Sequence, residues 1–374
     1  PLGTTPSDSV DIIEGADGAD IISGGGGNDT ISDANTPGLD VGNAGNVISG
    51  NGGSDEITIW ARGTGGFNPV SNVAYGDEGN DSISLRISDF YEQREQDPYG
   101  EPPTGTVQLY GGAGADILSA NTSIEAPGVQ SYFYGDAGAD TLQATVYFAE
   151  FDSRLGADNP DYLYGGDGND TYEVREAQDV VIEEAAKGYD SIRAYDTDYT
   201  LPANVEELQL AYDFFPSKLQ YRGIGNALSN NISAPQEGPE LDQLSYAIDG
   251  LAGNDVVYGS AAAIDTLSGG AGDDTIYGKQ AGGSYLGDYL DRDTARGGDG
   301  NDLIYGAGGP ADTWDHSDTL YGDLGNDTIY GQDGDDTVYG GRGLDDPTDG
   351  PDRIYGDAGN DQVWAGGGDD IVYG

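Results

Sequence analysis

The sequence contains no cysteine, which excludes disulfide bonds and thiolate metal sites as sources of stability. It has no methionine and a single histidine, His316. Basic residues are scarce, since 14 Lys and Arg stand against 68 Asp and Glu, for a formal charge of −54. Nucleic acid and anionic membrane surfaces carry the same sign of charge and are not expected as partners. No apolar run reaches the roughly 18 residues of a membrane span, so no membrane insertion is expected.

The side chains that common catalytic sites require are also missing. A single histidine excludes the zinc motif H-E-x-x-H, and the chain has neither a cysteine nucleophile nor a G-x-S-x-G elbow. The run from Gly165 to Gly168 resembles a nucleotide-binding loop but lacks the helix and the lysine that such loops need. Carboxylate pairs, which glycosidases use, are abundant, yet the turns described below explain nearly all of them. We therefore expect no enzymatic activity.

Glycine and acidic residues are what the sequence has in quantity. There are 64 glycines, and hydrophobic residues make up only 36% of the chain. Low hydrophobicity with so much like charge usually means disorder, but tyrosine is abundant at 26 residues, and the glycines and aspartates recur at fixed intervals. Because self-repulsion opposes compaction, we expect divalent cations to neutralise the chain. Metal is a common source of stability for an extracellular protein without disulfides.

A nonapeptide of the form G-G-x-G-x-D-x-U-x, in which U is a large apolar residue, recurs along the chain. A complete copy runs from Gly24 to Ser32. The same frame recurs at Gly269–Tyr277, Gly297–Tyr305, Gly322–Tyr330, Gly331–Tyr339, Gly356–Trp364 and Ala365–Tyr373, and further copies begin at Gly15, Gly50, Gly76, Gly111, Gly135, Gly165 and Gly250.

Each part of the nonapeptide has a physical role. Its glycines permit backbone angles that a side chain would forbid, and they let carbonyl oxygens converge on a cation. The aspartate at the sixth position adds a carboxylate, and oxygen-only ligands of these two kinds suit Ca²⁺. The last three residues indicate a short strand whose U side chain points inward.

The pattern resembles the RTX (repeats-in-toxin) family over most of the chain. The resemblance implies an all-β fold, a right-handed parallel β-roll, in which two nonapeptides form one coil and Ca²⁺ ions stack between turns of neighbouring coils. The alternative is that the sixth-position aspartates are solvated turn residues, but their regular phasing favours metal binding. The predicted calcium ligands are Asp20, Asp29, Asp55, Asp81, Asp116, Asp140, Asp170, Asp255, Asp274, Asp302, Asp327, Asp336, Asp361 and Asp370.

Longer turns interrupt the pattern and are expected to form insertions at the edges of the roll. Some still end in D-x-U-x, as at Asp265, Asp293, Asp318 and Asp352, but the swollen turn puts calcium binding there in doubt. Larger insertions near the N-terminus contain aromatic residues that either pack locally or form a binding surface, with packing favoured. These insertions are Ile59 to Ala74, Leu85 to Leu109, Ala120 to Phe133 and Ala144 to Leu163.

We predict two rolls, 8–173 and 246–374, joined by a metal-poor β spacer at 174–245. Within the spacer, Val180–Ile182 and Val205–Leu210 indicate strands, and Asn226 and Asn231 resemble weakened repeat positions. Residues 1–7 are expected to be a disordered start, whose Pro1-Leu2-Gly3 resembles a remnant of tag cleavage. The chain ends at the beginning of another repeat, so we expect it to be a fragment of a longer protein.

The residues at the ninth position of each nonapeptide are expected to point outward. If half-coils alternate between two faces, parallel stacking predicts a column of tyrosines on one face, with rungs about 4.8 Å apart. That column consists of Tyr258, Tyr277, Tyr305, Tyr330, Tyr355 and Tyr373. The opposite face is predicted to carry Ser268, Arg296, Tyr321, Tyr339 and Trp364. Such a strip is either ordinary β surface or a contact face.

Two functions fit these features. The first is a structural or adhesive module of a bacterial surface layer, adhesin or matrix protein, which folds on Ca²⁺ after type I secretion. Its partners are calcium and either further copies of itself or a cell-surface polysaccharide. The second is the calcium-dependent folding and export module of a larger secreted toxin or enzyme. The long repeat tract and the large insertions favour the first, and both place the chain outside the cell.

Overall fold

The computed structural model describes residues 9–15, 20–33, 45–62, 70–88, 104–122, 128–144, 160–212, 218–235, 244–260, 264–279, 292–307, 317–343 and 349–374. All regular structure in these residues is β, as predicted. The chain divides into two compact units, Pro1–Asp190 (unit 1) and Ser191–Gly374 (unit 2). None of the described residues forms a helix long and apolar enough to cross a membrane. The predicted start at 1–7 and His316 lie outside the described residues.

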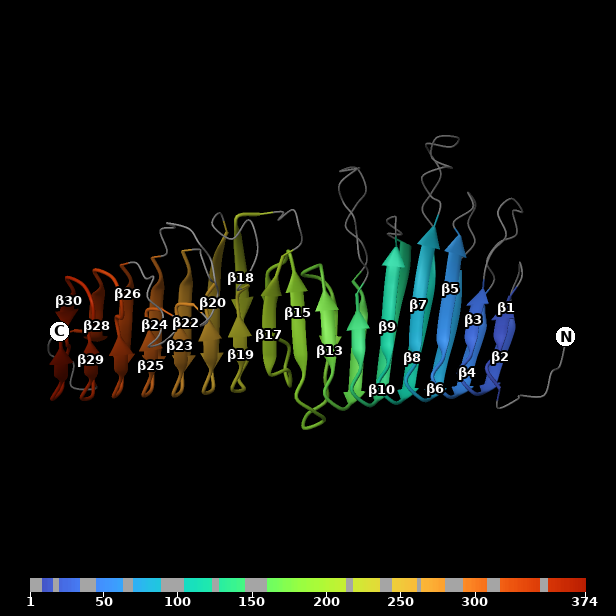
Figure 1. Ribbon diagram of the computed structural model, residues 1–374, viewed down its shortest axis with the longest axis horizontal. Coiled ribbons are helices and arrows are strands. Elements are labelled where there is room, and N and C mark those ends of the chain that lie inside the picture. The colour runs from blue at the N-terminus through green and yellow to red at the C-terminus, as the bar shows by residue number, and fades with distance from the viewer. Residues whose placement is uncertain are drawn as a thin grey trace, which may run out of the picture. The chain divides into compact units, whose positions relative to one another are not determined.

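In unit 1, successive strands alternate between two parallel sheets (Figure 1). One sheet consists of β1 (Ile12–Glu14), β3 (Thr30–Asp33), β5 (Glu56–Arg62), β7 (Ser82–Ser88), β9 (Ile117–Thr122), β11 (Thr141–Gln143) and β13 (Thr171–Val174). The other consists of β2 (Ile21–Gly26), β4 (Val47–Gly52), β6 (Val70–Glu78), β8 (Thr104–Ala113), β10 (Gly128–Ala137), β12 (Tyr162–Asp167) and β14 (Val180–Ile182).

Unit 2 alternates in the same way. Its odd-numbered sheet consists of β15 (Ser191–Tyr195), β17 (Glu207–Ala211), β19 (Asn231–Ser233), β21 (Val256–Tyr258), β23 (Thr275–Tyr277), β25 (Leu303–Tyr305), β27 (Thr328–Tyr330), β29 (Arg353–Tyr355) and β31 (Ile371–Tyr373). Its even-numbered sheet consists of β16 (Tyr199–Thr200), β18 (Gln220–Ile224), β20 (Ser245–Ala252), β22 (Thr266–Ala271), β24 (Thr294–Asp299), β26 (Thr319–Leu324), β28 (Thr337–Gly341) and β30 (Gln362–Trp364).

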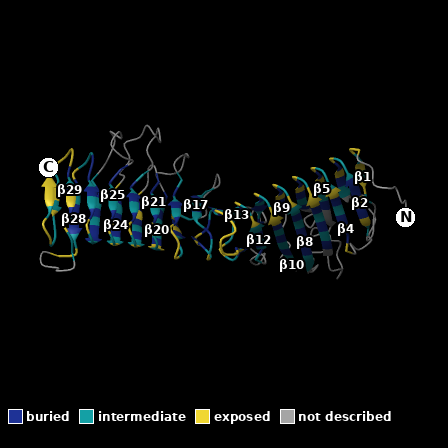
Figure 2. Ribbon diagram, turned by 90° about the horizontal axis from the view of Figure 1, so that it is seen from below, coloured by how far each residue is buried: buried dark blue, intermediate teal, exposed yellow. Residues whose placement is uncertain are grey.

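The strands are short because each contributes only one or a few inward-pointing residues between two turns. Ile276, Ile304 and Ile329 are register partners in β23, β25 and β27, and all three are completely buried. The residues on either side of each are only half-buried, so the core is a thin ladder of apolar side chains between the two sheets of the unit. Figure 2 shows buried and intermediate residues together along these strands. This is the parallel β-roll that the repeat predicts.

Two rows of turns connect the sheets of each unit. We call the turns that lead from an even-numbered to an odd-numbered strand the first edge, and those that lead from an odd-numbered to an even-numbered strand the second edge. Backbones stack very closely along the first edge. Gly300, for example, has a φ of 146°, and a Cβ there would clash with the carbonyl oxygen of Gly272 in the preceding coil. Only glycine fits such a position.

Several details differ from the sequence-based expectations. Phe133, assigned to an insertion, lies in β10 and is completely buried in the core of unit 1. The first three predicted insertions also begin and end as strand, because β5 to β10 extend into them, and the fourth ends in β12. The strand at Val180–Ile182 is confirmed, and β17 covers most of the second strand predicted in the spacer. The spacer thus coils like the flanking repeats, with part of it in each unit.

Candidate metal sites along the turns

A continuous ladder of aspartates follows the first edge of unit 1. In each coil the backbone N–H of the aspartate donates to Oδ1 of the aspartate in the next coil, as from Asp29 to Asp55 and from Asp55 to Asp81. The ladder continues through Asp116, Asp140 and Asp170 to Asp190 at 2.7–2.8 Å. In unit 2 an equivalent ladder runs from Asn230 through Asp255, Asp274, Asp302, Asp327 and Asp352 to Asp370 at 2.7–3.0 Å.

In most of the described coils of these ladders, and at Asp336 in the other row of unit 2, the second carboxylate oxygen is buried and makes no hydrogen bond. This holds for Oδ2 of Asp29, Asp55, Asp81, Asp116, Asp140, Asp255, Asp274, Asp302, Asp327, Asp336 and Asp352. A buried carboxylate oxygen without a partner is costly, because desolvation of the charge is not compensated. A cation beside each Oδ2 would supply that compensation.

The space beside each Oδ2 is lined by backbone carbonyl oxygen. A Cβ built on Gly24 would lie 2.5 Å from Oδ2 of Asp29 and 2.8 Å from the carbonyl oxygen of Gly50 in the next coil. The same pairing recurs at Gly135, where Oδ2 of Asp140 and the carbonyl oxygen of Gly165 converge. Glycine keeps this space open, and the oxygens that line it come from two neighbouring coils. Carboxylate and carbonyl oxygens form the donor set that Ca²⁺ prefers.

Burial and mutual repulsion raise the pKa of several of the stacked carboxyls. Desolvation is the largest cause for Asp140, Asp274 and Asp302, and the negative charge of neighbouring aspartates adds to it, so that each pKa rises to about 7. The backbone N–H that donates to each carboxylate opposes the shift only in part. The metal-free ladder is therefore unfavourable in its charged form, which is the form that binds metal.

The predicted ligands fall into two groups. Those within the ladders are 1–3% exposed, as are Asp29, Asp55 and Asp302. Asp20, Asp361 and Asp370 lie in the first or last coils of the rows and are only half-buried. Asp20 donates its N–H to Asn46 rather than to another aspartate.

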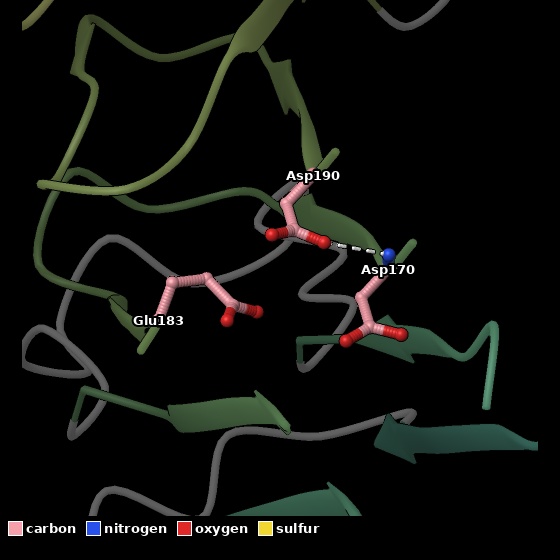
Figure 3. Close-up of side chains that lie close together, drawn as sticks. All are labelled: Asp170, Glu183 and Asp190. Atoms are coloured by element: carbon pink, nitrogen blue, oxygen red, sulfur yellow. Dashed lines mark hydrogen bonds between the residues drawn. The ribbon is translucent and has the colours of Figure 1, made fainter. Parts of the chain in front are cut away.

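The last coil of unit 1 gathers three carboxylates from two turns, with Asp170 before β13 and both Glu183 and Asp190 between β14 and β15. Oxygens of Asp170, Glu183 and Asp190 lie within 4.8 Å of one another, and all three residues are buried (Figure 3). The Tyr172 hydroxyl donates to Oε1 of Glu183. Burial raises the pKa of Glu183 to about 7 despite that hydrogen bond. Glu183 and the Tyr172 hydroxyl approach Gly165 where, in earlier coils, the carbonyl oxygen of the next glycine lies.

Comparison with protein families decides what these ladders are. The family described as "RTX calcium-binding nonapeptide repeat (4 copies)" matches residues 7–32, 104–122, 155–181, 247–263, 261–280, 290–309, 315–347 and 346–374. The chain belongs to the RTX family. No curated protein matches it. RTX nonapeptides bind Ca²⁺, and the stacked, buried carboxylates fit multiple calcium sites of a secreted calcium-binding repeat protein.

Residues that the sequence-based prediction missed also belong to this RTX architecture. Glu183 has no nonapeptide frame around it, so only its buried, acidic position in the fold reveals it. Asp265, Asp293, Asp318 and Asp352 follow swollen turns and were not predicted as ligands, yet each accepts a backbone N–H from the preceding coil at 2.7–2.9 Å. The retained D-x-U-x tail is the signal that could have identified them.

The spacer shows how the RTX coil continues where the repeats are weak. Asn226 Nδ2 donates to the carbonyl oxygens of Pro202 and Val205, each at 2.7 Å. An amide N–H group of one coil thus serves two carbonyl oxygens in the turn of the preceding coil. The ladder position itself is occupied by Asn230 and not by Asn231, which begins β19.

Proposed function

We propose that this RTX chain is a structural or adhesive module outside the cell, whose calcium-bound roll presents an outer face to further copies of itself. The tyrosine column of unit 2 carries this proposal. As predicted, the odd-numbered strands from β21 to β31 carry tyrosines at equivalent positions, namely Tyr258, Tyr277, Tyr305, Tyr330, Tyr355 and Tyr373. Neighbouring rings stack with centroids 4.6–5.0 Å apart and planes within 2–8°.

The opposite face of unit 2 also has the predicted composition. Ser268, Arg296, Tyr321, Tyr339 and Trp364 follow one another in register. The Arg296 guanidinium lies 3.8 Å from the centre of the Tyr321 ring, and the rings of Tyr339 and Trp364 stack at 4.8 Å. Unit 1 has a comparable column on its even-numbered sheet, made of Tyr75, Tyr110, Tyr134 and Tyr164. An extended aromatic surface is thus a feature of both units.

Ring stacking determines what such a column can bind. Because each ring in the column covers the face of its neighbour, the faces are not available for stacking against a sugar. The edges and hydroxyl groups remain, repeated at the spacing of the coils. A second roll has the same repeat, so its coils match this spacing along the whole column. We therefore favour self-association over polysaccharide binding, with no catalytic role.

Substitution of the column tests this function. The triple variant Tyr277→Ser, Tyr305→Ser, Tyr330→Ser removes three consecutive rings, while the double variant Thr275→Ser, Thr328→Ser changes the adjacent outward position on the same sheet. Circular dichroism in Ca²⁺ should show β structure in both variants. Sedimentation velocity should show assembly in the parent and the control, and its loss in the triple variant.

Two results would argue against self-association. If the triple variant folds and assembles like the parent, the column is ordinary β surface. If no protein assembles but the parent co-sediments with insoluble cellulose or peptidoglycan and the triple variant does not, the partner is a polysaccharide.

The calcium-dependent export module is the second candidate. The raised pKa values of Asp140 and Asp302 support it, because buried carboxyls oppose folding until calcium is present. Such a chain stays unfolded where calcium is low and folds where calcium is abundant. The two candidates differ in the aromatic column, which an export module does not need.

A further inference from the structure

The first and second edges of unit 1 differ in the charge of the side chains that line their turns. Counting nonapeptides does not reveal this difference. In the middle of the second edge of unit 1, the position that corresponds to the ladder aspartate, two residues before the inward apolar residue, is occupied by Asn46, Asn72, Val107 and Ser131. All four side chains are buried and none carries a charge. The hydrogen-bond ladder persists from Asp20 to Asn46 and from Asn46 to Asn72, at 2.8 and 3.0 Å.

Asn72 illustrates why such positions do not hold a cation. Its Oδ1 accepts the N–H of Asn46, which places the amide Nδ2 where an aspartate would have its second oxygen. Nδ2 is buried and has no hydrogen-bond partner. An N–H donor turned toward the space beside the turn repels a cation, whereas the Oδ2 of an aspartate attracts one. Val107, in the next coil, offers no ligand atom at all.

Of the acidic residues that return at the end of this edge, Asp179 already has both carboxylate oxygens engaged. Oδ1 of Asp179 accepts the N–H of Asp161 at 3.2 Å, which resembles the ladder. Its Oδ2, however, accepts the N–H groups of Arg175 and Glu176 at 3.3 and 3.2 Å. Local backbone donors therefore serve the oxygen that faces the turn in the calcium ladders.

The second edge of unit 2 has the opposite character. From Tyr246 onward, Asp265, Asp293, Asp318, Asp336 and Asp361 form a ladder at 2.7–3.0 Å. A Cβ on Gly331 would lie 2.6 Å from Oδ2 of Asp336 and 2.7 Å from the carbonyl oxygen of Gly356. On Gly306, before a swollen turn, it would lie 2.8 Å from Oδ2 of Asp318 and 2.6 Å from the carbonyl oxygen of Gly331. The swollen turn thus preserves the site.

On the first edge of unit 2, Asp352 likewise keeps the geometry of a regular site after a swollen turn. It follows the insertion between β28 and β29, yet it is 1% exposed and its Oδ2 has no hydrogen-bond partner. That oxygen and the carbonyl oxygen of Ala365 converge beside Gly340, as at the regular turns.

We propose that unit 1 binds calcium along its first edge only, whereas unit 2 binds calcium along both edges, including the swollen turns that end at Asp318 and Asp352. The inference rests on the calcium ladders and is independent of the adhesive role. In unit 1, the edge that carries the larger insertions is thus held by neutral side chains from Asn46 to Ser131, and the predicted ligand Asp20 at its start is followed by Asn46 in place of a second aspartate.

Crystals of the full chain grown in Ca²⁺ give the direct test. An anomalous difference map should show one row of peaks in unit 1, beside Asp29 to Asp170, and two rows in unit 2. Peaks beside Asn46, Asn72 or Val107, or their absence beside Asp318 and Asp352, would overturn the proposal.

Calcium counting on variants of the full chain supplies a second test. Equilibrium dialysis followed by elemental analysis should show fewer bound ions in Asp318→Asn and in Asp352→Asn than in the parent. The matched control Asn72→Ala should bind as many ions as the parent. A loss of bound calcium in Asn72→Ala, or no loss in both aspartate variants, contradicts the assignment.

Discussion

The backbone N–H of Asp274 donates to Oδ1 of Asp302, 28 residues later in the chain, at 2.8 Å. The two residues lie in successive coils. The buried carboxylate of each coil therefore holds the backbone of the turn in the coil before it. The other oxygen of Asp302 is left for calcium. The hydrogen-bond ladder and the metal row thus use the two oxygens of the same side chain.

Calcium removal should unfold the roll. A chelator leaves the carboxylates buried without a counter-charge, within a chain of net charge −54. Far-ultraviolet circular dichroism should show β structure lost in chelator and regained on addition of Ca²⁺. Mg²⁺ should substitute poorly, because it demands tighter octahedral geometry and releases its waters reluctantly. Full β content in chelator would contradict this expectation.

Asp302→Asn should raise the calcium concentration needed for folding severalfold. The change keeps the shape of the side chain but replaces the free Oδ2 by an amide, and an ion held at 100 times its dissociation constant contributes about 2.7 kcal/mol. Asp299→Asn is the matched control, since it removes one negative charge from the same repeat at an exposed position. Calcium titrations should separate the two variants, and equal midpoints would show that charge alone matters.

Acidification should weaken calcium-dependent folding. Protons compete with calcium for the carboxyls of Asp274 and Asp327, whose pKa in the metal-free fold is raised by burial from 3.8 to about 7. The folding midpoint in Ca²⁺ should therefore be higher at pH 5.5 than at pH 7.5. Without calcium the sign reverses, because a raised carboxyl pKa stabilises the fold at low pH and that stability is lost as the pH rises toward 7. Folding titrations at both pH values, with and without chelator, measure the direction of the pH effect in each case.

Glu183→Gln should weaken the site at the end of unit 1. The variant removes one of three carboxylates that lie within 4.8 Å, while the amide can still accept the Tyr172 hydroxyl. We expect a loss of calcium at that site with the regular sites of unit 1 retained. Glu184→Gln, at an exposed neighbour, is the control. An unchanged ion count in Glu183→Gln would assign Glu183 a structural role only.

Ile304→Ala should destabilise the calcium-bound roll by about 2–5 kcal/mol, because it empties a completely buried core position. Leu303→Ala changes the adjacent half-buried outward residue and should cost far less. Denaturant unfolding in saturating Ca²⁺ measures both. Similar losses of unfolding free energy in the two variants would show that β25 is not held by the thin apolar ladder.

The repeat frame was enough to predict the strands, their parallel register and the tyrosine column. Phase is retained through the swollen turns because Asp265 and Asp318 keep their distance from the U residue that follows, so each strand enters the core at the same position. Local spacing therefore determines which face each side chain lies on, whatever the length of the turn before it.

Other features depend on contacts between coils and were not accessible from the sequence. Phe133 reads as part of an insertion, but it is the register partner of Leu109 and Leu163 and therefore lies in the core. Glu183 acquires its role because its turn returns to Gly165. The neutral edge of unit 1 appears only when Asn72 and Val107 are seen to be register partners.

The alternation of strands between two sheets constrains how this protein changes length during evolution. Loss of one nonapeptide from unit 2 would exchange the faces of every strand beyond it, so that Tyr330 and Tyr355 would continue the column of Arg296. Loss of two consecutive nonapeptides would remove one whole coil and leave the aromatic columns and metal rows in phase. Viable length variants should therefore differ by even numbers of repeats.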